Sequence, residues 1–185
     1  MSKVRFGISD VVVFKRTEAE NAITYGSPME VKGAVSLSLD PQGDENVFYA
    51  DNIKYWVGTT NQGYEGTFEV ALVPDEFKKL YLGYKLADNG NLVETNAQGE
   101  SFGMVFKFKL DDEDRYAVLY NCTVSRPSEE HNTIEESATP DTDELTIAIS
   151  GDTVGTVQCY KAEIHASDSN YATAKTALAL PTFTE

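Results

Sequence analysis

Carboxylates are the most abundant side chains in this chain that could take part in chemistry. Asp and Glu together account for 30 of the 185 residues, so the spacing between any two of them carries little information. Glu65 and Glu69 would share one face of a strand, and paired carboxylates are the groups that hydrolyse glycosidic bonds. Glutamates are mostly exposed, and we therefore interpret this pair as part of a solvated strand face.

No other set of residues forms a recognisable catalytic or metal site. The acidic run Asp111–Asp114 lacks the glycine and the closing glutamate of an EF-hand loop, and aspartates are common in turns. The two histidines, His131 and His165, leave little material for zinc binding or acid–base catalysis. The sequence contains neither a P-loop nor a nucleophile elbow. We expect no enzymatic activity, no metal and no cofactor.

The charge balance argues against several kinds of partner. Lys and Arg number 15 against 30 Asp and Glu, which gives a net charge of −15. A chain this acidic repels phosphates, which argues against a nucleic-acid-binding module and against an anionic membrane surface. The apolar run Val11–Phe14 is too short for a signal peptide. We therefore expect a cytosolic origin, with Cys122 and Cys159 reduced.

Apolar and polar side chains alternate in the segments 31–40, 65–73 and 102–110. Successive side chains of a strand point to opposite faces, so each segment is predicted to be a strand with one buried side. The predicted buried sides consist of Val35, Leu37 and Leu39; Phe68, Val70 and Leu72; and Phe102, Met104, Phe106, Phe108 and Leu110. One-sided strands of this kind are typical of antiparallel sheets.

A short helix is predicted between the strands. The segment 74–84 begins with Pro74 and two acids and has Gly83 near its end, which is the usual asymmetry of helix termini. Its large apolar residues form one stripe; they are Phe77, Leu80, Tyr81 and Tyr84. The predicted fold class is mainly β: two packed antiparallel sheets, as a sandwich or half-barrel, with one short flanking helix.

We expect one domain with an appendage. Residues 1–166 are predicted to form a single β domain, which includes an acidic, proline-containing loop at 126–144. Residues 167–185 are rich in Ala, Thr and Ser and are predicted to be a C-terminal arm or tail. Turn residues at 88–91 and 111–114 predict two β-hairpins.

Several short motifs occur in the order found in one family of structural proteins. They are Phe48-Tyr49-Ala50-Asp51-Asn52, the strand end Glu69–Pro74 followed by a helix ending at Leu82-Gly83, and the later segments Arg115–Tyr120 and Ser125–Pro127. Over roughly residues 4–150 the chain resembles the major tail proteins of long-tailed bacteriophages, which are the subunits of the tail tube.

The resemblance implies a tail-tube fold and a structural function. Subunits of that family form hexameric rings, and the rings stack into the virion tail tube through which DNA passes at infection. The implied partners are further copies of the chain, the tape-measure protein, the tail terminator and the baseplate or distal tail proteins, with DNA as a non-specific cargo of the lumen. Assembly is expected in the cytoplasm of the bacterial host, without a membrane.

Two groups of residues are predicted to act in such a tube. Small and acidic side chains of two strand faces are expected to line the lumen: Ser36, Ser38, Asp40, Glu65, Thr67 and Glu69. Residues of the acidic loop and the C-terminal arm are expected to contact other subunits or rings: Glu129, Glu130, Ile134, Leu178, Leu180 and Phe183. An ordinary outer solvent face explains the first group equally well.

Two other functions stay open on the sequence. Trp56 and the ten tyrosines would give a carbohydrate-binding β-sandwich, such as an adhesin module, a platform of aromatic rings for sugars. Packing in a core or at an interface is the commoner use of such aromatic residues. A carboxylate-dependent hydrolase is the third class, and it ranks last because no pair of acids stands out.

Overall fold

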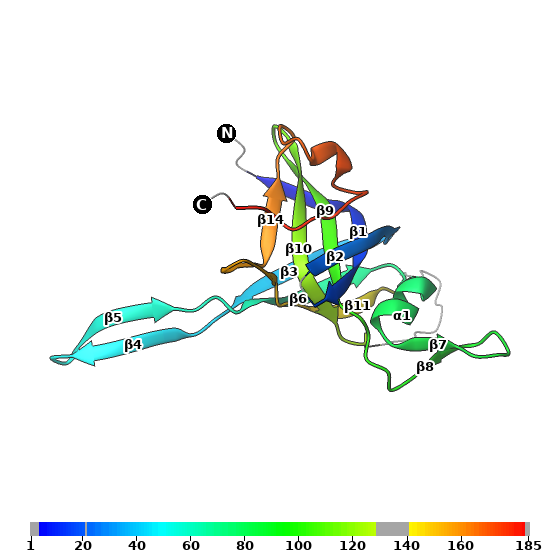
Figure 1. The fold of residues 1–185 in the computed structure, drawn as a ribbon, viewed down its shortest axis with the longest axis horizontal. Helices are drawn as coiled ribbons and strands as arrows, with labels where there is room; N and C mark the ends of the chain where they lie inside the picture. Colours follow the sequence, from blue (N-terminus) through cyan, green and yellow to red (C-terminus); the bar gives the residue numbers. More distant parts are fainter. Residues whose placement is uncertain (1–3, 21, 129–140, 184–185) are drawn as a thin grey trace, which may run out of the picture.

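The computed structural model describes residues 4–20, 22–128 and 141–183, and its fold is mainly β (Figure 1). The strands are β1 (Arg5–Ala19), β2 (Ala22–Glu30), β3 (Ala34–Gln42), β4 (Glu45–Ala50), β5 (Ile53–Thr59), β6 (Gly63–Val70), β7 (Tyr84–Leu86), β8 (Leu92–Glu94), β9 (Phe102–Leu110), β10 (Asp114–Val124), β11 (Asp143–Ile149), β12 (Asp152–Val154), β13 (Val157–Cys159) and β14 (Lys161–Ile164). The helices are α1 (Asp75–Tyr81) and the short 3₁₀ helix η1 (Tyr171–Thr173).

Most strands belong to one antiparallel sheet with the order β2-β1-β9-β10-β11-β6-β3, and β14 also pairs with β10. The sheet divides at β10, because residues 116–119 of this strand pair with β14 and residues 122–124 pair with β11. The two halves pack against each other as layers, and the outer strands β2 and β3 do not pair to close a barrel. The predicted mainly β fold with antiparallel layers and one short helix is confirmed, although the layers are halves of one sheet.

The main core lies between the two layers. Buried residues of β1, β9 and β10 face buried residues of β6 and β11; they are Val11, Val13, Phe102, Met104, Leu119 and Cys122 on one side and Phe68, Val70, Leu145, Ile147 and Ile149 on the other. Helix α1 closes this core with Phe77 and Tyr81, whose rings lie 5.7 and 4.7 Å from that of Phe102. The predicted helix is therefore confirmed, but it is shorter than expected, because Tyr84 begins β7.

A second core lies on the opposite face of β1, β9 and β10. Its residues include Val12, Phe14, Val105, Val118 and Ala174. The C-terminal segment, residues 167–183, covers this face, and Tyr171, Leu178 and Leu180 pack against it. Strand β1 is thus buried on both sides, which explains why the run Val11–Phe14 is continuously apolar instead of alternating. We call the two layers, α1 and the C-terminal segment together the body.

Two predicted strand faces are wrong at one residue each. Val35 is 51 % exposed, because a register irregularity places Ala34 opposite Val70 and then Ser36 opposite Glu69. Leu72 is 68 % exposed, because β6 ends at Val70 and the chain bends before it can place a further residue on the core face.

Candidate functional site

The six residues predicted to line a lumen come together on one surface. In the β3–β6 ladder, Ser36 lies opposite Glu69, Ser38 opposite Thr67, and Asp40 opposite Glu65. Directly opposite residues of an antiparallel pair share a face, and this face points away from the core residues Phe68 and Val70. Whether it faces a lumen stays a prediction.

Strand β11 widens this surface, which the sequence reasoning missed. Glu144 lies opposite Glu69, Thr146 opposite Thr67, and Ala148 opposite Glu65. The signal was present in the sequence, since Leu145, Ile147 and Ile149 alternate with these residues and are buried. We call the outward face of β3, β6 and β11 the polar wall; its residues are Ser36, Ser38, Asp40, Glu65, Thr67, Glu69, Glu144, Thr146 and Ala148.

The polar wall is acidic and has no cations of its own. Glu69 accepts hydrogen bonds from Thr142 Oγ1 at 2.7 Å and from Ser36 Oγ at 3.0 Å. These two hydrogen bonds hold the pKa of Glu69 below its ordinary value, and the bond from Thr142 has the larger effect. Among the described residues, no lysine or arginine forms an ion pair with Asp40, Glu65, Glu69 or Glu144. A surface of this kind repels polyanions instead of gripping them.

The β4–β5 hairpin projects from the body as a separate arm (Figure 1). It continues the β3–β6 ribbon, and none of its residues belongs to either core. Large apolar side chains nevertheless cover it, between 48 and 71 % exposed: Phe48, Tyr49, Ile53, Tyr55, Trp56 and Val57. An isolated two-stranded hairpin is marginally stable in water, and exposed apolar clusters mark interaction surfaces.

Three exposed aromatic rings lie close together in the sequence and pairing of this arm. Phe48 lies opposite Trp56 in the ladder, and the register of the ladder shifts between Phe48 and Tyr49. The ring centres of Phe48 and Tyr55 are 6.5 Å apart, and the two rings meet edge to face. The Trp56 indole lies over Gly58, where an added Cβ would come within 2.2 Å of the ring. We call Phe48, Tyr55 and Trp56 the aromatic face. Sequence reasoning assigned Trp56 to a core, an interface or a sugar platform but did not predict a projecting arm.

The residues predicted to contact other subunits are placed differently from one another. Leu178 and Leu180 are partly buried against the second core of their own chain. Phe183 is 55 % exposed and borders a cavity with Tyr160 and Pro181. Glu129, Glu130 and Ile134 lie outside the described residues.

A buried ion pair fixes the body on the side of the second core. Asp152 is only 2 % exposed; its Oδ1 accepts a hydrogen bond at 2.8 Å from Nε of Arg16 and forms an ion pair with Nη2 of Arg16, also at 2.8 Å. Tyr25 donates its hydroxyl proton to Asp152 Oδ2 and accepts a bond from the backbone N–H of Asn121 at 3.2 Å. Burial, and then the Asp152 carboxylate, raise the pKa of Tyr25 well above its ordinary value. All groups are paired, so the cluster joins β1, β2, β10 and β12 as a structural element.

The described residues show no group of three or more His, Cys, Asp or Glu side chains arranged to hold a metal ion. Within the same residues, no helix is both long and apolar enough to cross a bilayer. Comparison with models of known protein families returns no match, and comparison with curated protein sequences returns none either.

Proposed function

We propose that this chain is a self-assembling structural subunit of a tail tube, similar in role to the major tail proteins of long-tailed phages. Six copies would form a ring and rings would stack into the tube of a virion tail, assembled in the cytoplasm of a bacterial host. The further partners would be the tape-measure protein, the terminator and the baseplate or distal tail proteins. DNA would pass through the lumen, and no enzymatic step is involved.

The β4–β5 hairpin is the observation that carries the proposal. Its aromatic face and neighbouring apolar residues are exposed in the single chain, and none of the described residues outside the hairpin covers them. Burying a large apolar side chain contributes about 1.5–3 kcal/mol, so a second copy of the chain that covered this arm would gain several such contributions. Contacts between different surfaces repeat from copy to copy and generate rings or stacks.

The polar wall supports the second half of the proposal. It is a continuous face of three strands on which Asp40, Glu65, Glu69 and Glu144 carry negative charge without basic partners among the described residues. On the inside of a ring, this face would present only repulsive charge to DNA phosphates, so DNA would slide without adhering.

Electron microscopy of the purified protein tests the proposal directly. Samples over a range of concentrations are examined in negative stain, with light scattering measured on the same samples. We expect rings with sixfold end views or hollow tubes that appear as the scattering rises. A protein that stays monomeric at every concentration contradicts the proposal.

A carbohydrate-binding module is the second candidate, and the exposed aromatic face of the hairpin is the observation that favours it. Tyr55 and Trp56, 71 and 57 % exposed, could stack on sugar rings. This function predicts a monomer whose melting temperature rises with a particular glycan. A glycan array followed by a thermal shift assay separates the two functions, since a tube subunit shows neither response.

A further inference from the structure

The sheet leaves an open seam between β1 and β3. Strand β1 pairs with β2 only from Val12 onward, and β3 pairs with β6 alone among the described strands. The two free edges lie close to each other, but no ladder joins them. Free strand edges are surfaces at which another chain can bind.

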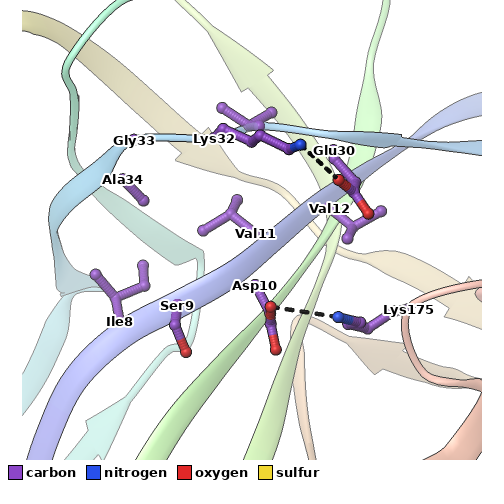
Figure 2. A pocket seen from close by; sticks show the side chains of 11 residues that line it. Ile8, Ser9, Asp10, Val11, Val12, Glu30, Lys32, Gly33, Ala34 and Lys175 are labelled. Carbon is purple, nitrogen blue, oxygen red and sulfur yellow. Dashed lines mark ion pairs between the residues drawn. The ribbon is translucent and has the colours of Figure 1, made fainter.

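A groove follows this seam in two parts that share Ile8. The first part, about 330 Å³, lies between residues 8–12 of β1 and residues 30–34 before and at the start of β3. Figure 2 shows Ile8 and Val11 on the side of β1 that faces Ala34, while Asp10 is turned toward Lys175 at 3.3 Å. This part is lined by charges of both signs, because Glu30 and Lys32 also border it.

The second part has an apolar floor and a cationic rim. It measures about 420 Å³, and its apolar residues are Ile8, Val35, Leu37, Leu39, Tyr64, Phe106 and Phe108. Arg5 and Lys161 are its charged residues, and none of the described residues that line it is acidic. Both cations lie near one carboxylate beside the groove, that of Glu163, at 3.9 and 3.5 Å, so two positive charges face a single negative one. The Arg5 guanidinium lies 4.8 Å from the centre of the Phe108 ring. We call this part the seam groove.

The tip of the β4–β5 hairpin has the complementary chemistry. Tyr49 and Ile53, 60 and 61 % exposed, flank the turn residues Asp51 and Asn52, which both have positive φ. Lys54 is the hairpin's only base, and its ammonium lies 3.3 Å from Glu45. Asp51 therefore stands at the tip as an acid between two exposed apolar residues.

We propose that the seam groove receives the β4–β5 hairpin of a second copy, with Tyr49 and Ile53 on its apolar floor and Asp51 against Arg5 and Lys161. This inference rests on the proposed self-assembly and names the surface that the arm meets. Each hairpin extends away from its own body beyond the far end of β3 (Figure 1). A chain therefore does not place its hairpin in its own seam groove, and the hairpin that enters the groove comes from a second copy. The contact joins two different surfaces, so it repeats along a stack.

Cysteine cross-linking between two differently tagged variants tests this placement. Ile53→Cys in one copy and Val35→Cys in the other should give a mixed disulfide dimer under assembling conditions. Ile53→Cys with Val93→Cys is the matched control, since Val93 is 44 % exposed on β8 outside the groove, and it should give none. The wild-type protein reports any background from Cys122 and Cys159, which are both buried.

Charge reversal provides a second readout. The double variant Arg5→Glu/Lys161→Glu should raise the concentration needed for assembly by about tenfold or more, and the further change Asp51→Lys should restore assembly. Lys79→Glu/Lys85→Glu, on exposed residues of α1 and β7, should leave assembly unchanged.

The outcomes separate this placement from the proposed function. Normal assembly with no Ile53–Val35 cross-link, or with no effect of charge reversal, overturns the placement and leaves self-assembly standing. A wild-type protein that never assembles overturns both.

Discussion

The body and the β4–β5 hairpin both contain strands with runs of large apolar side chains, but they differ in whether the chain itself covers those side chains. In β1, Val11 and Val13 lie in one core and Val12 and Phe14 in the other. In β5, Tyr55, Trp56 and Val57 are also three large, largely apolar side chains in a row, yet each is at least 48 % exposed. A strand that is apolar on both faces needs cover on both sides, and of these two strands β1 has such cover among the described residues while β5 does not.

The difference teaches that the two regions have separate tasks. The apolar side chains of the two cores of the body are buried within the chain, because α1 covers one core and the C-terminal segment covers the other. The hairpin leaves its aromatic face exposed, and under the proposed function a second copy of the chain covers it. Changes in the two cores of the body should therefore alter stability, and changes in the hairpin or in the seam groove should alter assembly.

The largest expected effect is the loss of assembly on removing the aromatic face. The variant Phe48→Ser/Tyr55→Ser/Trp56→Ser gives up about 5 kcal/mol or more of apolar burial between copies, which raises the concentration needed for assembly more than about 1,000-fold. Its melting temperature should stay close to that of the wild type, because the hairpin lies outside both cores. Light scattering and thermal unfolding measure the two effects.

The matched control removes exposed apolar residues elsewhere. Leu72→Ser/Leu86→Ser/Val93→Ser changes side chains that are 68, 61 and 44 % exposed and lie outside the β4–β5 hairpin. If the control variant assembles and the hairpin variant does not, the hairpin is the surface that drives assembly. If both variants lose assembly equally, the distinction between the hairpin and the rest of the molecule fails.

The next effect is a large loss of stability from one core residue. Phe102 is fully buried against Phe77 and Tyr81, so Phe102→Ala should lower the free energy of unfolding by about 3–5 kcal/mol. Tyr49→Ala in the hairpin should change it by less than about 0.5 kcal/mol. Urea denaturation of both variants as monomers measures this, and similar losses would show that the hairpin is part of the cooperative fold.

A smaller loss is expected from the buried ion pair. Asp152→Asn removes the charge that faces Arg16, but Arg16 keeps an ion pair with Glu18 at 2.8 Å. We therefore expect a cost of about 2–3 kcal/mol, below that of leaving a buried charge unpaired. Asp51→Asn at the hairpin tip is the control and should leave the urea midpoint unchanged; an unchanged midpoint for Asp152→Asn would refute the structural role of the pair.

The smallest effect concerns alkaline pH. Burial, above all, raises the pKa of Tyr81 and of Tyr120 to about 12, above the ordinary value near 10. A raised folded-state pKa means that this stability is complete below pH 10 and is lost as the pH rises from 10 to about 12. At pH 11 each tyrosine should account for about 1 kcal/mol of the loss. Tyr81→Phe should reduce the difference between urea denaturation at pH 9 and at pH 11, and an undiminished difference would argue against this origin.

The parts of the fold that could be predicted depend on neighbours in the sequence. Alternation over 102–110, the turn at 111–114 and the apolar stripe of Phe77 and Tyr81 each reflect local geometry, and the structure confirms the strand, the hairpin and the helix. The polar faces of β3 and β6 also followed from alternation, and the ladder brings them together.

The parts that could not be predicted depend on contacts between distant segments. Val35 is exposed because of a register irregularity that only the pairing with β6 defines. The joining of β11 to the polar wall requires knowing that Glu144 pairs with Glu69. Trp56 favours a strand whether it is buried in a core or exposed at an interface, so the sequence around it does not say whether the rest of the chain covers it.

The fluorescence of Trp56 tests the central claim most directly, because it is the only tryptophan of the chain and lies on the aromatic face. Its emission spectrum is recorded with light scattering as the protein concentration rises. The account predicts that the emission moves to shorter wavelength in parallel with the scattering, because assembly removes the indole from water. Assembly that leaves the emission of Trp56 unchanged would contradict the account, since the hairpin would then remain exposed in the assembled state.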